Sequence, residues 1–477
     1  MASTGCHFRL RLGVLAILYV SWFTDGANGA ERSRPNILII TADNLGYGDL
    51  QAFNPDSPIL TPHLDQLAAE GARLTDFYSA SPTCTVSRAC LLTGRVADRH
   101  GLKDQLPGIE GNYGPGLSSK EILIPQLMKQ AGYSTGCFGK WNIGFAEGSR
   151  PTERGFDEFL GHASGNIDYY SHKYNGKHDL FRGIQPAHVE GYSTDLFADA
   201  AIDFITRQHP RPWFVYLPFN APHFPNARNK EPGELVLWQA PDEAFQRYEY
   251  DPKTTDPRQR YHAVVTALDS AIGRVFEKLR ELRQEEDTFV FFFSDNGAFM
   301  LRDRGLEVAS NKPLRDGGVT CWEGGIRVAA FARWPGRIAA GSVISEPAWS
   351  PDLLTTCVHL TGSGLPENTV LDGINILPLL EQKNSPAPRR SLYFTYRQGS
   401  ALRMEDWKIL RTKPGKQWQL FDLRRDPGES TNLAEQNPVV REKLVGEFNR
   451  WQASIAQTSR TRDPSIPGRP FQLRQAE

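Results

Sequence analysis

Strand-like and helix-like segments alternate along the chain from about residue 35 to about residue 360. The strand-like runs are dominated by apolar, β-branched and aromatic residues, and they lie at 36–40, 133–138, 213–219 and 288–293. Amphipathic periodicity with helix-type ends marks the segments at 62–71, 124–131, 194–207, 261–283 and 352–360. Continuous apolar strands between helices are typical of a mostly parallel sheet that helices cover on both faces. The pattern therefore predicts a large α/β domain over residues 31–360.

The pattern changes after residue 360. Short strand-like pieces at 391–396, 407–411 and 418–423 are separated by turns, and a helix-like segment follows at 438–453. This order predicts a small antiparallel sheet closed by one helix, in a C-terminal α+β subdomain over residues 361–460. Residues 461–477 are polar and rich in proline, so we expect a loose tail.

The first thirty residues resemble a targeting segment. Arg9 and Arg11 precede an apolar run at 12–23, and small residues follow at 27–30. A charged start, a short apolar run and a small-residue exit predict a cleaved secretory signal peptide. The run is short for a membrane span, and an uncleaved anchor is the alternative. We expect an exported protein, periplasmic or secreted, that is not attached to a membrane after cleavage.

Composition narrows the class of protein. The 477 residues include 54 Lys+Arg and 55 Asp+Glu, and 40% of them are hydrophobic. Such a chain can bury a sizeable core, and its balanced charge argues against a nucleic-acid partner. Removal of the signal peptide leaves five of the six cysteines, and an odd cysteine in an exported protein indicates a special or modified residue.

Two of the predicted strands end in the same pair of residue types. Asp43 and Asn44 follow the first strand, and Asp295 and Asn296 follow the strand at 288–293. The carboxyl ends of parallel strands meet at one edge of a sheet, where ligands bind. Carboxylate and amide oxygens suit Ca²⁺ or Mg²⁺, so these four residues are a candidate metal site. The alternative is that Asp and Asn simply favour turns.

The other strand ends add a cation and a base. Lys140 follows the strand at 133–138 and His223 follows the strand at 213–219. Beside a divalent cation, a lysine can neutralise developing charge and a histidine can protonate a leaving oxygen, which favours an anionic ester as substrate. Cys84 opens a helix-like segment with Arg88 one turn later, and this position predicts a thiolate.

A set of short segments in fixed order resembles one enzyme family, the formylglycine-dependent sulfatases of the alkaline-phosphatase-like superfamily. The similarity covers residues 35–435 and is carried by segments 34–37, 45–50, 61–65, 84–95, 139–141, 221–223, 294–297, 322–327, 420–423 and 426–429. The resemblance implies the alkaline-phosphatase-like version of the predicted fold, and hydrolysis of aryl sulfates or of sulfated carbohydrates. The implied substrate is a sulfated small molecule or glycan.

The resemblance also implies roles for particular residues. A formylglycine-generating enzyme would oxidise Cys84 before or during export, and the hydrated aldehyde would attack the sulfur atom. The implied Ca²⁺ ligands are Asp43, Asn44, Asp295, Asn296 and the modified Cys84. Arg88 would steady the formylglycine, while the residues facing the substrate would be Lys140, Asn142 and His223.

Four positions depart from the family pattern. Val86 replaces the proline of the maturation segment, and Asn44 replaces an aspartate. Asn142 replaces a histidine, and Gly318 replaces a lysine whose place Lys312 or Arg315 could take. Two alternatives therefore stay open: a sulfatase-like protein without catalysis, and a phosphonate or phosphodiester hydrolase on the same scaffold. Specificity is expected in the loops at 161–189 and 226–257.

Overall fold

The computed structural model describes residues 1–5, 34–365, 369–382 and 390–458. Most of the expected signal peptide and the whole of the expected tail at 461–477 therefore lie outside the described residues. Residues 34–458 belong to one compact unit, and the boundary expected near residue 360 stays a prediction. Within the described ranges, no helix is both long enough and apolar enough to cross a membrane.

A ten-stranded sheet forms the centre of the unit, in the order β13-β2-β12-β11-β1-β10-β4-β5-β8-β9. The five middle strands are parallel: β11 (Thr288–Ser294), β1 (Asn36–Ala42), β10 (Trp213–Pro218), β4 (Ser134–Lys140) and β5 (Glu158–His162). Antiparallel pairing begins on both sides of these five, where β12 (Ala330–Arg333) joins β11 and β8 (Phe181–Arg182) joins β5. The remaining edge strands are β2 (Ala72–Leu74), β13 (Ser342–Ile344) and β9 (Gln185–Pro186). The mostly parallel sheet is thus confirmed.

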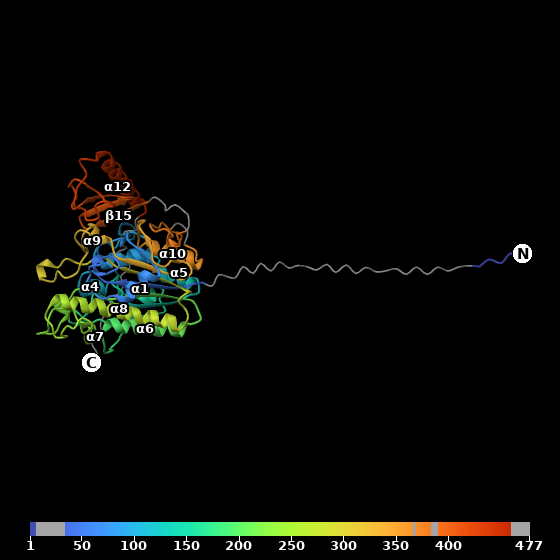
Figure 1. Cartoon of the computed structure of the whole chain (residues 1–477), viewed down its shortest axis with the longest axis horizontal. Coiled ribbons are helices and arrows are strands. Elements are labelled where there is room, and N and C mark those ends of the chain that lie inside the picture. The colour runs from blue at the N-terminus through green and yellow to red at the C-terminus, as the bar shows by residue number, and fades with distance from the viewer. Residues whose placement is uncertain (6–33, 366–368, 383–389, 459–477) are drawn as a thin grey trace. The chain divides into compact units, whose positions relative to one another are not determined.

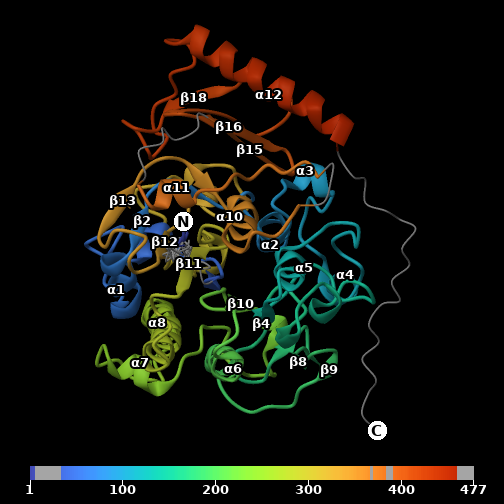
Figure 2. The same ribbon diagram turned by 90° about the vertical axis from the view of Figure 1, so that its right-hand side faces the viewer.

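Helices cover both faces of this sheet. Successive side chains of each strand point to opposite faces, so each strand contributes to two separate apolar clusters. On β1, Leu38 and Ile40 pack in one apolar cluster while Ile37 and Ile39 pack in another. The first cluster includes side chains of α1 (Pro62–Glu70), α6 (Ser193–Gln208), α7 (Asp242–Gln246) and α8 (Pro257–Glu281). The second includes side chains of α2 (Cys84–Thr93), α5 (Ile124–Gln130), α10 (Asp352–Thr361) and α11 (Leu377–Leu380). Figure 2 shows α6, α7 and α8 on one side of the sheet and α2, α5 and α10 on the other.

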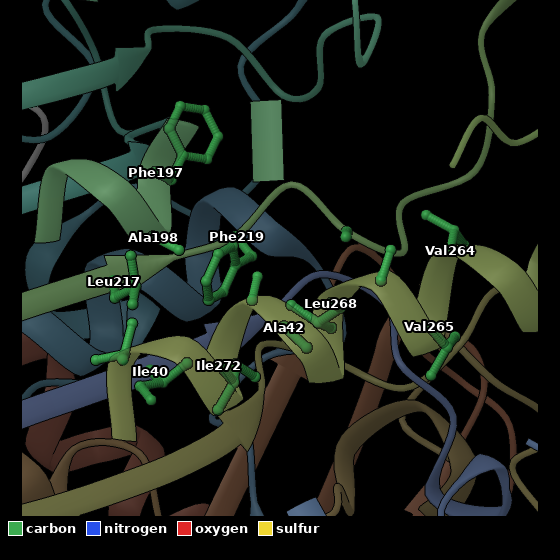
Figure 3. Close-up of a cluster of buried hydrophobic side chains, with 14 of the residues drawn as sticks. Ile40, Ala42, Phe197, Ala198, Leu217, Phe219, Val264, Val265, Leu268 and Ile272 are labelled. Atoms are coloured by element: carbon green, nitrogen blue, oxygen red, sulfur yellow. The ribbon is translucent and has the colours of Figure 1, made fainter. Parts of the chain in front are cut away.

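The contact between β1, β10 and the helices α6 and α8 shows why these strands are apolar at every position. Ile40 and Ala42 of β1 lie near Ile272 and Leu268 of α8, and Leu217 of β10 lies near Ala198 of α6 (Figure 3). All of these side chains are fully buried. The strand ends are therefore fixed in a close-packed interior, and the residues that follow them start from defined positions.

A four-stranded antiparallel sheet and the helix α12 (Pro438–Thr458) form the C-terminal part. Its strands are β15 (Ser391–Tyr396), β16 (Gly399–Met404), β17 (Trp407–Arg411) and β18 (Gln419–Asp422). The sequence pattern missed β16, because its polar and charged residues hide the alternation. One apolar cluster joins this sheet to α2 and to the loop before α9 (Glu323–Ile326), through Val86, Trp322 and Phe394 among others. Figure 1 shows the C-terminal sheet and α12 above α9 and α10.

The smaller elements connect these layers. Two short sheets pair β3 (Phe77–Tyr78) with β14 (Ala348–Trp349) and β6 (Lys173–Tyr174) with β7 (Lys177–His178). Short helices are α3 (Ala97–His100), α4 (Gly108–Asn112), η1 (Tyr47–Asp49), η2 (Pro151–Glu153), η3 (Ala227–Asn229) and η4 (Arg302–Arg304).

Candidate active site

The two Asp-Asn pairs meet at the carboxyl edge of the sheet, as the sequence predicted. β1 and β11 are neighbours, with Ala42 opposite Ser294, so the residues after them emerge side by side. The backbone N–H of Asn44 donates to Asp295 Oδ1 at 3.3 Å, and Asn296 Nδ2 donates to Asn44 Oδ1 at 2.6 Å. Asn44 has φ 65°, a left-handed conformation that asparagine tolerates better than most residues. Four hard oxygen-bearing side chains thus share one buried place.

Cys84 joins this place from the N-terminus of α2. Its Sγ lies 3.3 Å from Asp43 Oδ1 and 3.7 Å from Asn44 Oδ1. Ligand-type atoms of Cys84, Asp43 and His223 all lie within 4.8 Å of one another. Residues separated by up to 180 positions in the sequence are therefore brought together by the ends of β1 and β10 and the start of one helix.

Two buried cations neutralise the two carboxylates. Lys140 Nζ lies 2.6 Å from Asp43 Oδ2, and Arg88 Nη2 lies 2.6 Å from Asp295 Oδ2. Arg88 also donates from Nη1 to the backbone oxygen of Lys140 at 3.0 Å, which ties the helix α2 to the end of β4. Since an unpaired buried charge is costly, each cation stabilises the carboxylate that it contacts.

The environment of Cys84 does not produce a thiolate, and the sequence-based prediction on this point was wrong. Burial and the nearby Asp43 carboxylate raise the pKa of the thiol well above its ordinary value, although Lys140 and Arg88 act in the opposite direction. A helix N-terminus and one arginine cannot offset complete desolvation of a thiolate. The cysteine itself is therefore a protonated thiol.

Several buried polar atoms around these residues have no hydrogen-bond partner among the described residues. They are Asn44 Nδ2, Asn296 Oδ1, both polar side-chain atoms of Asn142, and both ring nitrogens of His162. Buried polar atoms are nearly always paired in proteins, so a cluster of unpaired ones indicates a place that receives a ligand. Ca²⁺ prefers oxygen ligands, and the site offers the carboxylates of Asp43 and Asp295 together with the unpaired side-chain oxygen of Asn296. These residues fit such an ion.

His162 belongs to the segment at 161–189 in which the sequence analysis expected specificity, but its position at the end of a strand beside the site was not predicted. It ends β5, directly opposite Lys140 in the parallel register, and its ring stacks on Phe197 with centroids 6.1 Å apart. Burial, together with the charges of Lys140 and Arg88, holds the pKa of His162 well below its ordinary value. The strand before it is only five residues long and was not recognised. Had β5 been recognised, the rule that ligands collect after strand ends would have identified His162.

His223 is held by its own loop. Its Nδ1 donates a hydrogen bond to the Phe224 carbonyl oxygen, 2.8 Å away. The other ring nitrogen, Nε2, does not take part in this hydrogen bond. The hydroxyl of Tyr169 donates to the backbone oxygen of His223 at 3.2 Å. Burial and Lys140 lower the pKa of His223 to about 3, so the ring is neutral. Tyr169 and His172 of the loop at 161–189 are themselves buried, whereas Tyr170 is exposed.

Two of the four positions that depart from the family pattern, Val86 and Gly318, lie in closely packed surroundings. Val86 is fully buried in the apolar cluster between α2 and the C-terminal sheet. At Gly318, an added Cβ would lie 2.5 Å from the ring of Phe299, so a lysine does not fit there unless that ring moves. Arg315 stacks on Trp322 and donates to the Glu429 backbone oxygen at 2.8 Å, so it is engaged away from the Gly318 position. Lys312 is exposed.

Comparisons with known proteins agree with this geometry. The family model for sulfatase matches residues 35–363, and the model for the C-terminal part of N-sulphoglucosamine sulphohydrolase matches residues 320–453. N-acetylgalactosamine-6-sulfatase of Rattus norvegicus is 34% identical over 398 residues, covering 80% of this chain and 72% of that protein. Arylsulfatase A of Homo sapiens is 32% identical over 458 residues, covering 84% and 83%.

Solved structures give the same result. The crystal structure of Ps i-CgsB has a TM-score of 0.80 at 31% identity and covers 91% of this chain and 96% of that one. A complex of the same protein with k-i-k-neocarrahexaose has a TM-score of 0.79. A phosphonate monoester hydrolase from Silicibacter pomeroyi, at 20% identity and a TM-score of 0.63, shares the fold alone. Since the sulfatase model spans most of the chain and the relatives align along most of their own length, this protein belongs to the sulfatase family and is a sulfuric ester hydrolase.

Proposed function

We propose that the chain removes sulfate from a sulfated glycan, using the site around Cys84. The observation that carries the proposal is the convergence of Cys84, Asp43 and His223 within 4.8 Å at a sheet edge that also presents Lys140. The glycan follows from the relatives, because one is named for N-acetylgalactosamine-6-sulfate chemistry and another was solved with a neocarrahexaose. The proposal includes export of the protein, because a glycan outside the cell requires an enzyme outside the cell.

A formylglycine made from Cys84 and one Ca²⁺ are part of the proposal. The hydrated aldehyde would supply a nucleophilic hydroxyl, and the ion would supply positive charge that favours loss of its proton. Asp43, Asn44, Asp295 and Asn296 would hold the ion. Cys84 is fully buried, so a formylglycine-generating enzyme would have to reach it before the chain folds.

The remaining residues would orient and neutralise the substrate. Lys140 ends β4 with its ammonium group inside the site, where it can pair with a sulfate oxygen when the ester displaces it from Asp43. His223 is neutral, with its ring proton on the nitrogen that faces Phe224. It would therefore first accept a proton at Nε2, such as the one lost by the attacking hydroxyl, and would then give that proton to the leaving oxygen. Asn142 and His162 have unpaired polar atoms that can hydrogen-bond the sulfate group. Arg88 would keep the residue at position 84 in place through Asp295 and the Lys140 carbonyl.

The test combines a mass measurement with kinetics. The tryptic peptide 74–88 from protein made in its native host should carry the aldehyde or its hydrate at Cys84. Hydrolysis of 4-nitrophenyl sulfate should vanish in Cys84→Ala. The matched control is Cys357→Ala, a buried cysteine in α10 outside the site, which should retain turnover.

Three outcomes would contradict the proposal. An intact thiol with no turnover, together with binding of a sulfated oligosaccharide, would indicate a sulfatase-like binding protein. Faster hydrolysis of phosphonate or phosphodiester esters than of sulfates would indicate the other alternative. Equal turnover in the wild type and in Cys84→Ala would place the chemistry elsewhere.

A further inference from the structure

A cavity of about 310 Å³ lies between the loop before α9 and the C-terminal sheet, and no step of the proposed reaction uses it. We call it the arginine groove. Its principal lining residues are Val319, Cys321 and Trp322 on one side and Arg397, Leu410 and Arg411 on the other. The volume is at the lower end of the range for small-molecule sites.

The arginine groove begins next to the residues that carry Cys84. The backbone N–H of Val319 donates to the Pro82 oxygen at 2.9 Å, and Pro82 precedes Cys84 by two residues. Two residues of extended chain span at most about 7 Å. The backbone N–H of the adjacent Gly318 donates to the Ala298 oxygen at 3.0 Å, close to the Asp295-Asn296 pair. The groove is therefore a neighbour of the reaction site and not a remote cavity.

The charge of the arginine groove has one sign. The described lining residues include two that are positively charged, Arg397 and Arg411, and none that carries a carboxylate. Arg411 stacks on Trp418 with its guanidinium carbon 4.6 Å from the ring centroid, and its Nε is buried without a hydrogen-bond partner. Arg397 is largely exposed, reaching Asp104 only at 3.5 Å on the surface. The Arg411 guanidinium also lies 5.8 Å from the ring centroid of Phe448 in α12, so it packs on the α12 face of the sheet. Arg397 is therefore the guanidinium group that can take up an anion in the groove.

The walls of the groove are held in an uncommon conformation. Val319 has φ 65° and is 41% exposed, although a β-branched residue rarely adopts the left-handed region and a valine normally prefers burial. Arg397 has φ 50° on the opposite wall. Such conformations persist where the surrounding structure fixes them, and they concentrate at functional sites.

Resting on the proposed function, we infer that the arginine groove is a subsite for a second sulfate group, carried by a sugar next to the one whose ester is hydrolysed. Guanidinium groups bind sulfate-type oxyanions with paired hydrogen bonds, and the indole of Trp322 and the Leu410 side chain give the sugar an apolar surface. Two anion-binding places side by side would select a polysulfated chain over a small monosulfated ester.

The test compares two substrates in variants that leave the reaction site untouched. Arg397→Gln removes one charge from an exposed side chain, and Gln398→Glu adds a negative charge at an exposed lining residue, so neither threatens the fold. We expect each to raise the KM for sulfated neocarrahexaose about tenfold while kcat changes little. The kinetics with 4-nitrophenyl sulfate, which is too small to reach the groove, should not change.

Two controls sharpen the comparison. Arg424→Gln removes another exposed arginine from the C-terminal part outside the groove, and it should leave both substrates unaffected. Arg397→Lys keeps the positive charge and should recover most of the lost affinity. Raised salt should weaken binding of the hexaose more in the wild type than in Arg397→Gln, because a charge-assisted contact is screened.

Binding measured by calorimetry separates this inference from the proposed function. If the wild type binds the hexaose tightly and Arg397→Gln binds it weakly, the subsite stands even where no ester is hydrolysed. The inference is overturned if the groove variants and the wild type bind the hexaose equally, or if the wild type does not bind it. It is also overturned if Arg397→Gln impairs 4-nitrophenyl sulfate and the hexaose to the same extent.

Discussion

Replacing Lys408 by methionine tests how the C-terminal sheet is attached to the rest of the chain. Lys408 of β17 lies 2.8 Å from Glu323 Oε1 and 2.8 Å from Glu429 Oε1, and all three side chains are fully buried. Glu429 Oε2 in turn accepts the backbone N–H of Glu323 at the start of α9, at 2.6 Å. One ammonium group therefore neutralises two carboxyl groups that belong to different parts of the fold.

The size of the effect depends on pH. In the wild type, Lys408 holds the pKa of Glu323 low, while burial raises the pKa of Glu429 from 4.5 to about 7. Without Lys408, burial raises the pKa of Glu323 against Arg327 and Arg403 alone, and in the limiting case Glu323 also takes up a proton on folding. For a carboxyl with an unfolded pKa of 4.5, this costs under about 1 kcal/mol at pH 5 and about 5 kcal/mol at pH 8. The second figure agrees with the about 3–5 kcal/mol typical of broken buried ion pairs.

The direction of the pH effect on stability follows from the linkage between proton binding and folding. A carboxyl whose folded pKa is raised stabilises the folded state below its unfolded pKa, and this contribution is lost as pH rises through the folded pKa. Wild-type stability should thus fall between pH 4.5 and 7 because of Glu429, and Lys408→Met should steepen the fall. The free energy of unfolding, measured by urea denaturation at pH 5 and pH 8, gives both values.

A matched control and a rescue make the result decisive. Lys413→Met replaces an exposed lysine that follows β17 and should change stability little at either pH. Adding Glu323→Gln to Lys408→Met should recover stability at pH 8, because no second proton is then needed. An equal loss at pH 5 and pH 8, or a loss below about 1 kcal/mol at pH 8, would refute the reasoning.

Three further variants test other buried groups. Burial raises the pKa of Asp269 to about 7, although its carboxylate accepts hydrogen bonds from the backbone N–H groups of His63 and Leu64. Asp269→Asn should therefore remove about 4 kcal/mol of the change in unfolding free energy between pH 4 and pH 8, measured by urea denaturation at both pH values. His162→Phe removes two unpaired ring nitrogens and keeps the stacking on Phe197, so it should raise the free energy of unfolding by about 1 kcal/mol. The same variant should lower kcat/KM for 4-nitrophenyl sulfate, and unchanged kinetics would exclude a role for His162 in the site. Gly318→Lys should lower stability by about 1–3 kcal/mol because its Cβ meets the Phe299 ring, and the loss in thermal denaturation should shrink in a Phe299→Ala background.

The main elements and the centre of the site could be read from the sequence because they depend on local patterns. The run at 36–40 is the core of β1, and the helix expected at 62–71 is α1, which begins with proline at Pro62 and ends before Gly71. Both Asp-Asn pairs follow strands, so their meeting required only that the strands be parallel neighbours. β5 and β16 were missed because a short strand with glycine or charged residues carries little periodicity.

What the sequence by itself determined is the α/β architecture, the edge at which chemistry gathers, and the residue types there, since periodicity and strand ends are properties of consecutive residues. The tertiary structure alone decided the protonation of Cys84, because desolvation depends on everything packed around the thiol. It also decided that Arg315 contacts Glu429, that His162 lies opposite Lys140, and that Arg397 lines the same cavity as Val319. Each of these contacts joins residues far apart in the chain, and their distances follow from packing, which no local pattern encodes.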